Sequence, residues 1–233
     1  MDIGKYVIIE EGVSIGENVK IGNFVIIYKG TKIGDNVVIH DHVVIGKQPM
    51  RAKRSALSMK SEVNGAVIRN GCTIGTSSII YAGATLEDDV FIADLATVRE
   101  RVFIGKETIV GRGVAIENDC KIGERCKLET NSYITAYSQL EDDVFIAPCV
   151  VTTNDNFMGR TKERFKHFKG VTVKRGGRIG ANATILPGKV IAEDAQVAAG
   201  SVVTKHVQGE CVVVGNPAKV VRQVSEEQLL KNQ

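Results

Sequence analysis

The chain has 233 residues, of which 43% are hydrophobic, 24% are charged and 5% are aromatic, and its formal net charge is +3. This composition is too rich in apolar residues for a disordered chain. No window approaches 18 uninterrupted apolar residues, and the first residues lack a basic-then-apolar signal pattern. We therefore expect a cytoplasmic enzyme or binding protein without a membrane partner.

An aliphatic residue recurs every six positions in three runs, from Ile3 to Ile45, from Ile68 to Thr152 and from Val173 to Val203. Of these 29 positions, 28 carry Ile, Val or Leu. Small residues or Val stand two positions earlier, and Gly often follows. Two alternating inward residues predict a short strand, and Gly or Asn predicts the turn after it.

Each six-residue unit is thus one strand and one corner, and three units close a triangular coil of 18 residues. The sequence predicts an all-β prism of about ten such coils, because each coil buries its apolar face against its neighbours. The narrow lumen explains why the chain has 12 aromatic residues and no Trp.

This pattern resembles the hexapeptide-repeat family, the left-handed parallel β-helix. The resemblance implies left-handed winding, and a homotrimer of acyltransferase subunits with sites between them. We expect the β-helix over residues 1–222 and a helical tail over 223–233. In that tail, Ser225 and Gln228 form a predicted capping box, and a short helix through Leu229 and Leu230 is expected to close the end of the prism.

Two segments break the repeat, 46–67 and 153–172, and both are basic. Loops that interrupt a solenoid often form its binding face. Arginine and lysine clusters bind phosphate oxygens, whereas the nearly neutral chain argues against a nucleic-acid partner. We expect the loops to bind a phosphate-bearing small molecule, with solvated loops as the alternative. The candidate substrate-binding residues here are Arg51, Arg54, Asp155, Arg160 and His167.

The five cysteines and four histidines do not indicate a metal site or a disulfide. Cys72, Cys120 and Cys126 occupy the small inward position of the repeat, where Cys acts as a small hydrophobe. There is no Cys-x-x-Cys pair, and only His40 and His42 lie close together. We expect no bound metal.

Thr152 replaces the aliphatic residue where the chain leaves the coil for the second loop, which predicts that it is exposed at a site. The following segment resembles the Thr-Asn segment of nucleotide-sugar N-acetyltransferases, and the resemblance covers residues 116–222. It implies that Asn154 lies near the amino group of the sugar. An Asx turn at the start of the loop is the alternative interpretation.

The same resemblance implies that Asn131 contacts the reacting groups, although other Asn residues hold this corner position without a site. Glu129 stands where Gly is usual, so its carboxylate points either to solvent or to the site. Those enzymes often have a Glu 18 residues before the loop Asn, where this chain has Ala136.

The resemblance also implies a binding segment for acetyl-CoA in the last third of the chain. Small corner residues let the backbone approach the pantetheine arm, and Ala181 and Ala199 are expected to make these contacts. Thr204, Lys205 and Arg222 are expected to hold the nucleotide end. The alternative is that the small residues only pack and Lys205 is solvated.

These features predict an N-acetyltransferase that acts on a nucleotide-linked amino sugar by direct attack of the amine. No Ser-His-Asp or Cys-His pairing predicts an acyl-enzyme. Acyl transfer to a hydroxyl or to an amino-acid amine, and a non-catalytic scaffold, are the alternatives.

Overall fold

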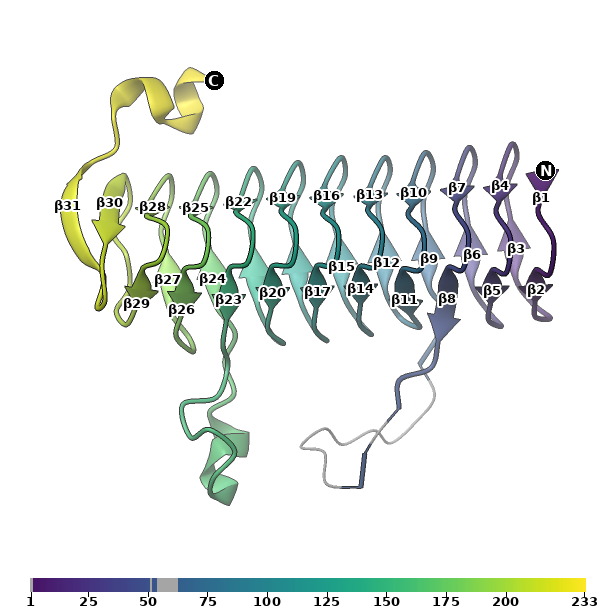
Figure 1. Cartoon of the computed structure of the whole chain (residues 1–233), viewed down its shortest axis with the longest axis horizontal. Coiled ribbons are helices and arrows are strands. Elements are labelled where there is room, and N and C mark those ends of the chain that lie inside the picture. Colours follow the sequence, from purple (N-terminus) through teal and green to yellow (C-terminus); the bar gives the residue numbers. More distant parts are fainter. Residues whose placement is uncertain (1, 51, 54–62) are drawn as a thin grey trace.

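The computed structural model describes residues 2–50, 52–53 and 63–233. Its strands coil in a left-handed sense into a three-sided prism, with one strand on each side of every coil (Figure 1). The three sides are parallel sheets, here named A, B and C in the order in which the chain visits them. Each strand pairs with the strand one coil earlier and one coil later, as the repeat predicts.

Sheet A has twelve strands, all parallel except the last, which pairs antiparallel with its neighbour. Its strands are β1 (Asp2–Ile3), β4 (Lys20–Ile21), β7 (Val38–Ile39), β10 (Thr73–Ile74), β13 (Phe91–Ile92), β16 (Ile109–Val110), β19 (Lys127–Leu128), β22 (Phe145–Ile146), β25 (Arg178–Ile179), β28 (Gln196–Val197), β30 (Cys211–Val214) and β31 (Lys219–Gln223). The eleven parallel strands are slightly more than the ten coils expected, because β30 lies beyond the six-residue pattern.

Sheets B and C hold ten and nine strands. Sheet B contains β2 (Ile8–Ile9), β5 (Ile26–Ile27), β8 (Val44–Lys47), β11 (Ile79–Tyr81), β14 (Thr97–Val98), β17 (Ala115–Ile116), β20 (Tyr133–Ile134), β23 (Val151–Thr152), β26 (Thr184–Ile185) and β29 (Val202–Val203). Sheet C contains β3 (Ser14–Ile15), β6 (Lys32–Ile33), β9 (Val67–Ile68), β12 (Thr85–Leu86), β15 (Phe103–Ile104), β18 (Lys121–Ile122), β21 (Gln139–Leu140), β24 (Thr172–Val173) and β27 (Val190–Ile191).

The aliphatic residues of the repeat form the core of the prism. From Ile21 onward those in the strands are almost wholly buried, whereas Ile3 and Ile9 in the first coil are 46% and 39% exposed. No described residue pairs with the outer edge of that coil. The predicted ladders are confirmed, and only the open N-terminal end leaves them uncovered.

Small polar side chains at the inward position bind backbone carbonyls of the next coil, which the sequence did not reveal. Cys126 Sγ donates to Glu141 O at 3.1 Å, and Thr108 Oγ1 donates to Gly123 O at 2.9 Å. Burial raises the pKa of the Cys126 thiol to about 11. These groups satisfy corner carbonyls that have no strand partner, so their role is structural.

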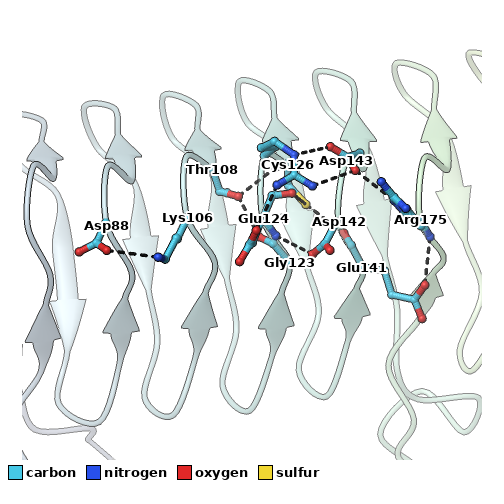
Figure 2. A network of polar contacts seen from close by, with 11 residues as sticks. Asp88, Lys106, Thr108, Gly123, Glu124, Cys126, Glu141, Asp142, Asp143 and Arg175 are labelled. Carbon is cyan, nitrogen blue, oxygen red and sulfur yellow. Dashed lines mark hydrogen bonds and ion pairs between the residues drawn. The ribbon is translucent and has the colours of Figure 1, made fainter. Parts of the chain in front are cut away.

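Polar contacts also tie successive coils along the corner between sheets C and A, the C–A corner (Figure 2). Asp142 Oδ1 accepts from Glu124 N at 2.9 Å, and Asp143 pairs with Arg125 at 2.8 Å and with Arg175 at 3.3 Å. At this corner the pKa of Asp143 is lowered, mainly by its hydrogen bond from Arg125. The corner is therefore a surface of mutually compensated charges.

The C-terminal tail holds two short 3₁₀ segments, η2 (Glu226–Gln228) and η3 (Leu230–Asn232). Ser225 makes no side-chain capping bond, so the predicted capping box is wrong. The tail turns back along the C–A corner, opposite the two protruding loops (Figure 1), where Leu230 N donates to Asp194 at 3.2 Å. The antiparallel β31, which the sequence did not predict, covers the last edge of sheet A.

Candidate functional site

Both interruptions of the repeat leave the prism at the corner between sheets B and C, the B–C corner. The first follows β8 and the second follows β23, and in both places the chain leaves the prism on the same side (Figure 1). Five coils separate the two exits, which corresponds to about 24 Å at the usual strand spacing. Arg51 and Arg54, expected to bind substrate, lie outside the described residues.

The second loop is held together by its own contacts around Asp155. This carboxylate accepts from Phe157 N at 2.8 Å and from Gly159 N at 3.0 Å, and it pairs with Arg164 at 2.9 Å. Burial alone would raise the pKa of Asp155, but these backbone hydrogen bonds and Arg164 lower it overall. The Asx turn expected as an alternative for Asn154 is formed by Asp155 instead.

Aromatic side chains pack against Arg164 and against one another in this loop, and Phe165 among them is 52% exposed. The Arg164 guanidinium lies 5.1 Å from the ring of Phe168 and 5.5 Å from that of Phe165, and His167 packs against Phe157 at 5.7 Å. The loop contains one 3₁₀ helix, η1 (Lys162–Lys166). The loop therefore has a defined conformation, and the side chains of Arg160 and His167 are exposed at its surface, where a ligand can reach them.

Asn154 stands where the second loop leaves the prism, and its carbonyl accepts from Lys169 N at 3.2 Å. Its side chain is half-buried and has no hydrogen-bond partner among the described residues. Thr152 before it is buried, contrary to expectation: Oγ1 accepts from Thr135 N at 2.8 Å and donates to Tyr133 O at 3.0 Å. The break in the ladder is therefore a structural feature.

Asn131 lies on a different edge, the corner between sheets A and B, or A–B corner. It adopts a left-handed backbone with φ of 59° and stacks in one column with Cys149 and Asn182. Glu129 is half-buried at the start of the same corner. A whole side of the triangle, β20, separates Asn131 from the B–C corner. One chain therefore does not bring Asn131 and Asn154 to a common point.

The expected cofactor residues are divided between the same two edges. Ala181 and Ala199 stack on the A–B corner, where a Cβ added to Gly180 would lie only 2.5 Å from Ala199 N. This corner carries Gly or Ala after the aliphatic residue in most coils, and at the glycines a Cβ would meet the backbone of the next coil. Farther along the last of these corners, Ala199 and Gly200 are exposed, and a Cβ added to Gly200 would meet nothing within 4 Å.

Thr204 and Lys205 follow β29 on the B–C corner. They line a cavity of about 290 Å³ under the β30–β31 hairpin. His206 also lines this cavity. Its Nδ1 accepts a hydrogen bond from Val190 N at 3.1 Å, so this nitrogen is already engaged within the protein. Arg222 lies exposed on β31 and donates to Gln223 O.

Sequence reasoning missed a polar cluster on the B–C corner, between the bases of the two loops. Glu100 there is fully buried and accepts from Arg99 at 2.9 Å and 3.3 Å, while Arg99 also donates to Glu117 at 3.3 Å and lies 5.0 Å from the Tyr81 ring. The sequence does contain a signal for this cluster. At the B–C corner long side chains follow the aliphatic residue in these coils, whereas the A–B corner mostly has Gly or Ala there.

Comparison with known families confirms the repeat. The model described as bacterial transferase hexapeptide (six repeats) matches residues 12–47, and that of the hexapeptide repeat of succinyl-transferase matches residues 97–123 and 175–205. The hexapeptide repeat of these families is therefore present in those segments of the chain. Within the described residues, no group of three or more His, Cys, Asp or Glu is placed to hold a metal ion, and no helix is long and apolar enough for a membrane span.

Two curated relatives match parts of the chain. It is 38% identical over 87 residues to a serine acetyltransferase of Buchnera aphidicola subsp. Acyrthosiphon pisum, covering 37% of this chain and 30% of the relative. It is 51% identical over 55 residues to a 2,3,4,5-tetrahydropyridine-2,6-dicarboxylate N-acetyltransferase of Staphylococcus aureus, covering 24% of this chain and 23% of the relative. The matches thus span less than a third of these relatives' length.

Two solved structures share the fold along nearly the whole chain. The UDP-N-acetylglucosamine acyltransferase from Campylobacter jejuni superposes with a TM-score of 0.63 at 17% identity, over 93% of this chain and 73% of that one. The UDP-N-acetylglucosamine O-acyltransferase from Moraxella catarrhalis gives 0.57 at 20% identity, over 97% and 76%.

Proposed function

We propose that this protein is an acetyltransferase that moves an acetyl group from acetyl-CoA to the amine of a nucleotide-linked amino sugar. The observation that carries the proposal is the agreement between acetyltransferase relatives and the A–B corner. Its small residues Ala181, Ala199 and Gly200, of which the last two are exposed, suit the extended amide-bearing arm of CoA. Thr204, Lys205 and Arg222 would then hold the nucleotide end of CoA.

In this reaction the neutral amine of the acceptor attacks the thioester carbonyl. The C–N bond forms, the tetrahedral oxyanion collapses, the C–S bond breaks, and the amine proton leaves to the CoA thiolate or to water. The described cysteine thiols at the inward position are buried, with raised pKa values, which disfavours a covalent acyl-enzyme. Catalysis would rest on positioning and on a donor to the oxyanion.

The separation of Asn131 from Asn154 within one chain supports a homotrimer with shared sites. The A–B corner of one prism would face the B–C corner of its neighbour, so that both Asn side chains meet the reacting groups. Arg160 and His167 on the second loop would contact the acceptor's diphosphate, with Asp155 holding that loop in shape.

The test is an acetyl-transfer assay with separate measurement of CoA binding. The protein is incubated with acetyl-CoA and with UDP-, GDP- or dTDP-linked 3-amino and 4-amino sugars, and free thiol is followed. Serine and an amino dicarboxylate serve as alternative acceptors. Thiol release with an amino-sugar nucleotide is expected. CoA binding without release for any amino sugar would refute this function, and release with serine alone would replace it by hydroxyl transfer.

A further inference from the structure

The B–C corner between the two loops carries an unusual run of long side chains. Tyr81, Arg99 and Glu117 stand in consecutive coils directly after the aliphatic residue, at the place where the A–B corner mostly has Gly or Ala. In the coil before them Gly46 holds this place, and Lys47 pairs with Tyr81 across a bulge. Together these side chains bridge the distance from the base of the first loop toward Asn154 at the base of the second. The A–B corner shows that the fold accepts small residues at this position. The long side chains at the B–C corner are therefore not needed to form the coil.

Glu100 gives this run a fixed centre. It is 0% exposed, and both of its carboxylate oxygens accept from Arg99. Burying a carboxylate is costly unless it is paired and hydrogen-bonded. The pair therefore fixes the guanidinium plane in one orientation, with 20% of the Arg99 side chain still open to solvent.

The exposed side of the run has spare hydrogen-bonding capacity. Arg99 uses three of its five N–H donors on Glu100 and Glu117. Glu117 Oε2 accepts one of these, and Oε1 has no hydrogen-bond partner among the described residues. Tyr133 stacks on Ala115 in the neighbouring coil, and burial, followed by the negative charge of Glu117, raises the pKa of its phenol. Tyr81 supplies an aromatic face below Arg99.

We propose that Tyr81, Arg99 and Glu117 form the subsite that binds the hydroxyl-bearing ring of the acceptor, and that Glu100 is the positioning residue that fixes Arg99. This inference rests on the proposed function and names its specificity site. A ring hydroxyl can accept from Arg99 and donate to Glu117 at the same time. A phosphate is disfavoured, because the Arg99 guanidinium already faces the two carboxylates of Glu100 and Glu117.

The decisive experiment separates sugar binding from nucleotide binding. Calorimetry measures Kd for UDP and for UDP-N-acetylglucosamine, and for the nucleotide and amino-sugar nucleotide of the best acetyl-transfer substrate. The ratio of Kd for the nucleotide to Kd for the sugar nucleotide isolates the contribution of the sugar to binding. Glu117→Gln is expected to reduce that ratio about tenfold, the effect of losing one hydrogen bond to a charged group, without changing Kd for the nucleotide alone.

Asp119→Asn is the matched control, because Asp119 pairs with Arg101 at 2.6 Å on the same corner but outside the run. It should leave the ratio within twofold of the wild-type value. Equal effects of the two variants, an unchanged ratio in Glu117→Gln, or no measurable gain from any sugar would overturn the subsite. Absence of acetyl transfer to every amino sugar would instead refute the proposed function, so the two failures are distinguishable.

The positioning role of Glu100 is tested by rescue. Glu100→Gln keeps an acceptor for Arg99, whereas Glu100→Leu does not. In variants that keep the wild-type Tm within a few degrees, KM for the acceptor should rise at least fivefold more in the leucine variant, with KM for acetyl-CoA unchanged. If Glu100→Leu lowers Tm strongly, Arg99→Lys replaces it, since lysine lacks the planar fork. Equal acceptor KM values throughout would contradict the assignment.

Discussion

Thr152 shows how a single hydroxyl can replace an aliphatic residue inside the lumen. Its Oγ1 serves both a backbone N–H and a backbone carbonyl at a point where the β20–β23 pairing is reduced. Thr152→Val keeps the shape but leaves the Thr135 N–H without its acceptor. We expect a loss of about 2 kcal/mol in the free energy of unfolding, measured by urea denaturation. Thr152→Ser should retain most of the stability, and a valine variant as stable as the wild type would contradict this role.

Asn154 and Asn131 are predicted to act in turnover and not in folding. Each side chain has no hydrogen-bond partner among the described residues, so replacement by alanine should leave Tm nearly unchanged at Asn154. At Asn131, where φ is 59°, alanine is strained and Tm should fall by a few degrees. We expect kcat to fall at least tenfold in either variant, because positioning of the amine or carbonyl is lost. Asn36→Ala is the control, since Asn36 holds a left-handed corner with φ of 58° in an early coil. A similar fall in the control would point to a general corner effect.

At the residue scale, the sequence revealed which positions face the lumen but not how polar residues there are used. Thr152 was expected to be exposed because a polar residue broke the pattern, yet its hydroxyl finds backbone partners that only the stacked coils provide. The burial of Glu100 was not predicted, because Glu100 lies at a corner and not in the ladder. A corner position suggests solvent, and its burial arises from Arg99 and the neighbouring coils.

The second loop is an element with its own polar core, and Asp155 is its central group. Asp155→Asn removes the ion pair with Arg164 but keeps a hydrogen-bond acceptor, so the loop should loosen without leaving the prism. We expect faster tryptic cleavage between residues 160 and 169. Glu163→Gln is the control, because Glu163 pairs with Lys166 on the exposed side. Equal cleavage rates in the two variants would contradict the role of Asp155.

This contact also predicts a pH dependence. The pKa of Asp155 is lowered in the folded loop, so its contribution to loop stability is fully present above about pH 4, the unfolded value. It is lost as the pH falls through the lowered folded value. Pepsin cleavage within the loop, normalised to an unstructured peptide, should therefore be greater at pH 2 than at pH 4. An equal ratio at both pH values would show that the carboxylate does not hold the loop.

At the element scale, strands and corners were predictable because each depends on six neighbouring residues. The interior of the second loop was not, since the contact between Asp155 and Arg164 joins residues with no periodic relation. The antiparallel β31 escaped prediction for a similar reason. Its exposed valines carry no inward alternation, and its place is set by the free edge of β30.

The whole molecule behaves as a one-dimensional stack, so the cost of a core substitution should depend on its position along the axis. Ile116 is fully buried in the middle of the prism, whereas Ile9 is 39% exposed in the first coil. Ile116→Ala should cost about 2–5 kcal/mol, the range for buried large-to-small changes. Ile9→Ala should cost less than about 1 kcal/mol. Urea denaturation of both variants is the measurement, and similar losses would contradict a graded stack.

The number of coils between the two loop exits fixes the distance between the bases of the two loops. Adding or deleting one complete 18-residue coil between β11 and β20 would keep every inward residue inward and would change the loop separation by about 4.8 Å. An insertion that is not a whole number of coils would have to leave the prism as a loop, as the two existing interruptions do, or would turn the ladder out of phase. Relatives that differ in acceptor length could therefore arise by whole-coil duplication, with reach changing in discrete steps while the chemistry at each loop base stays intact.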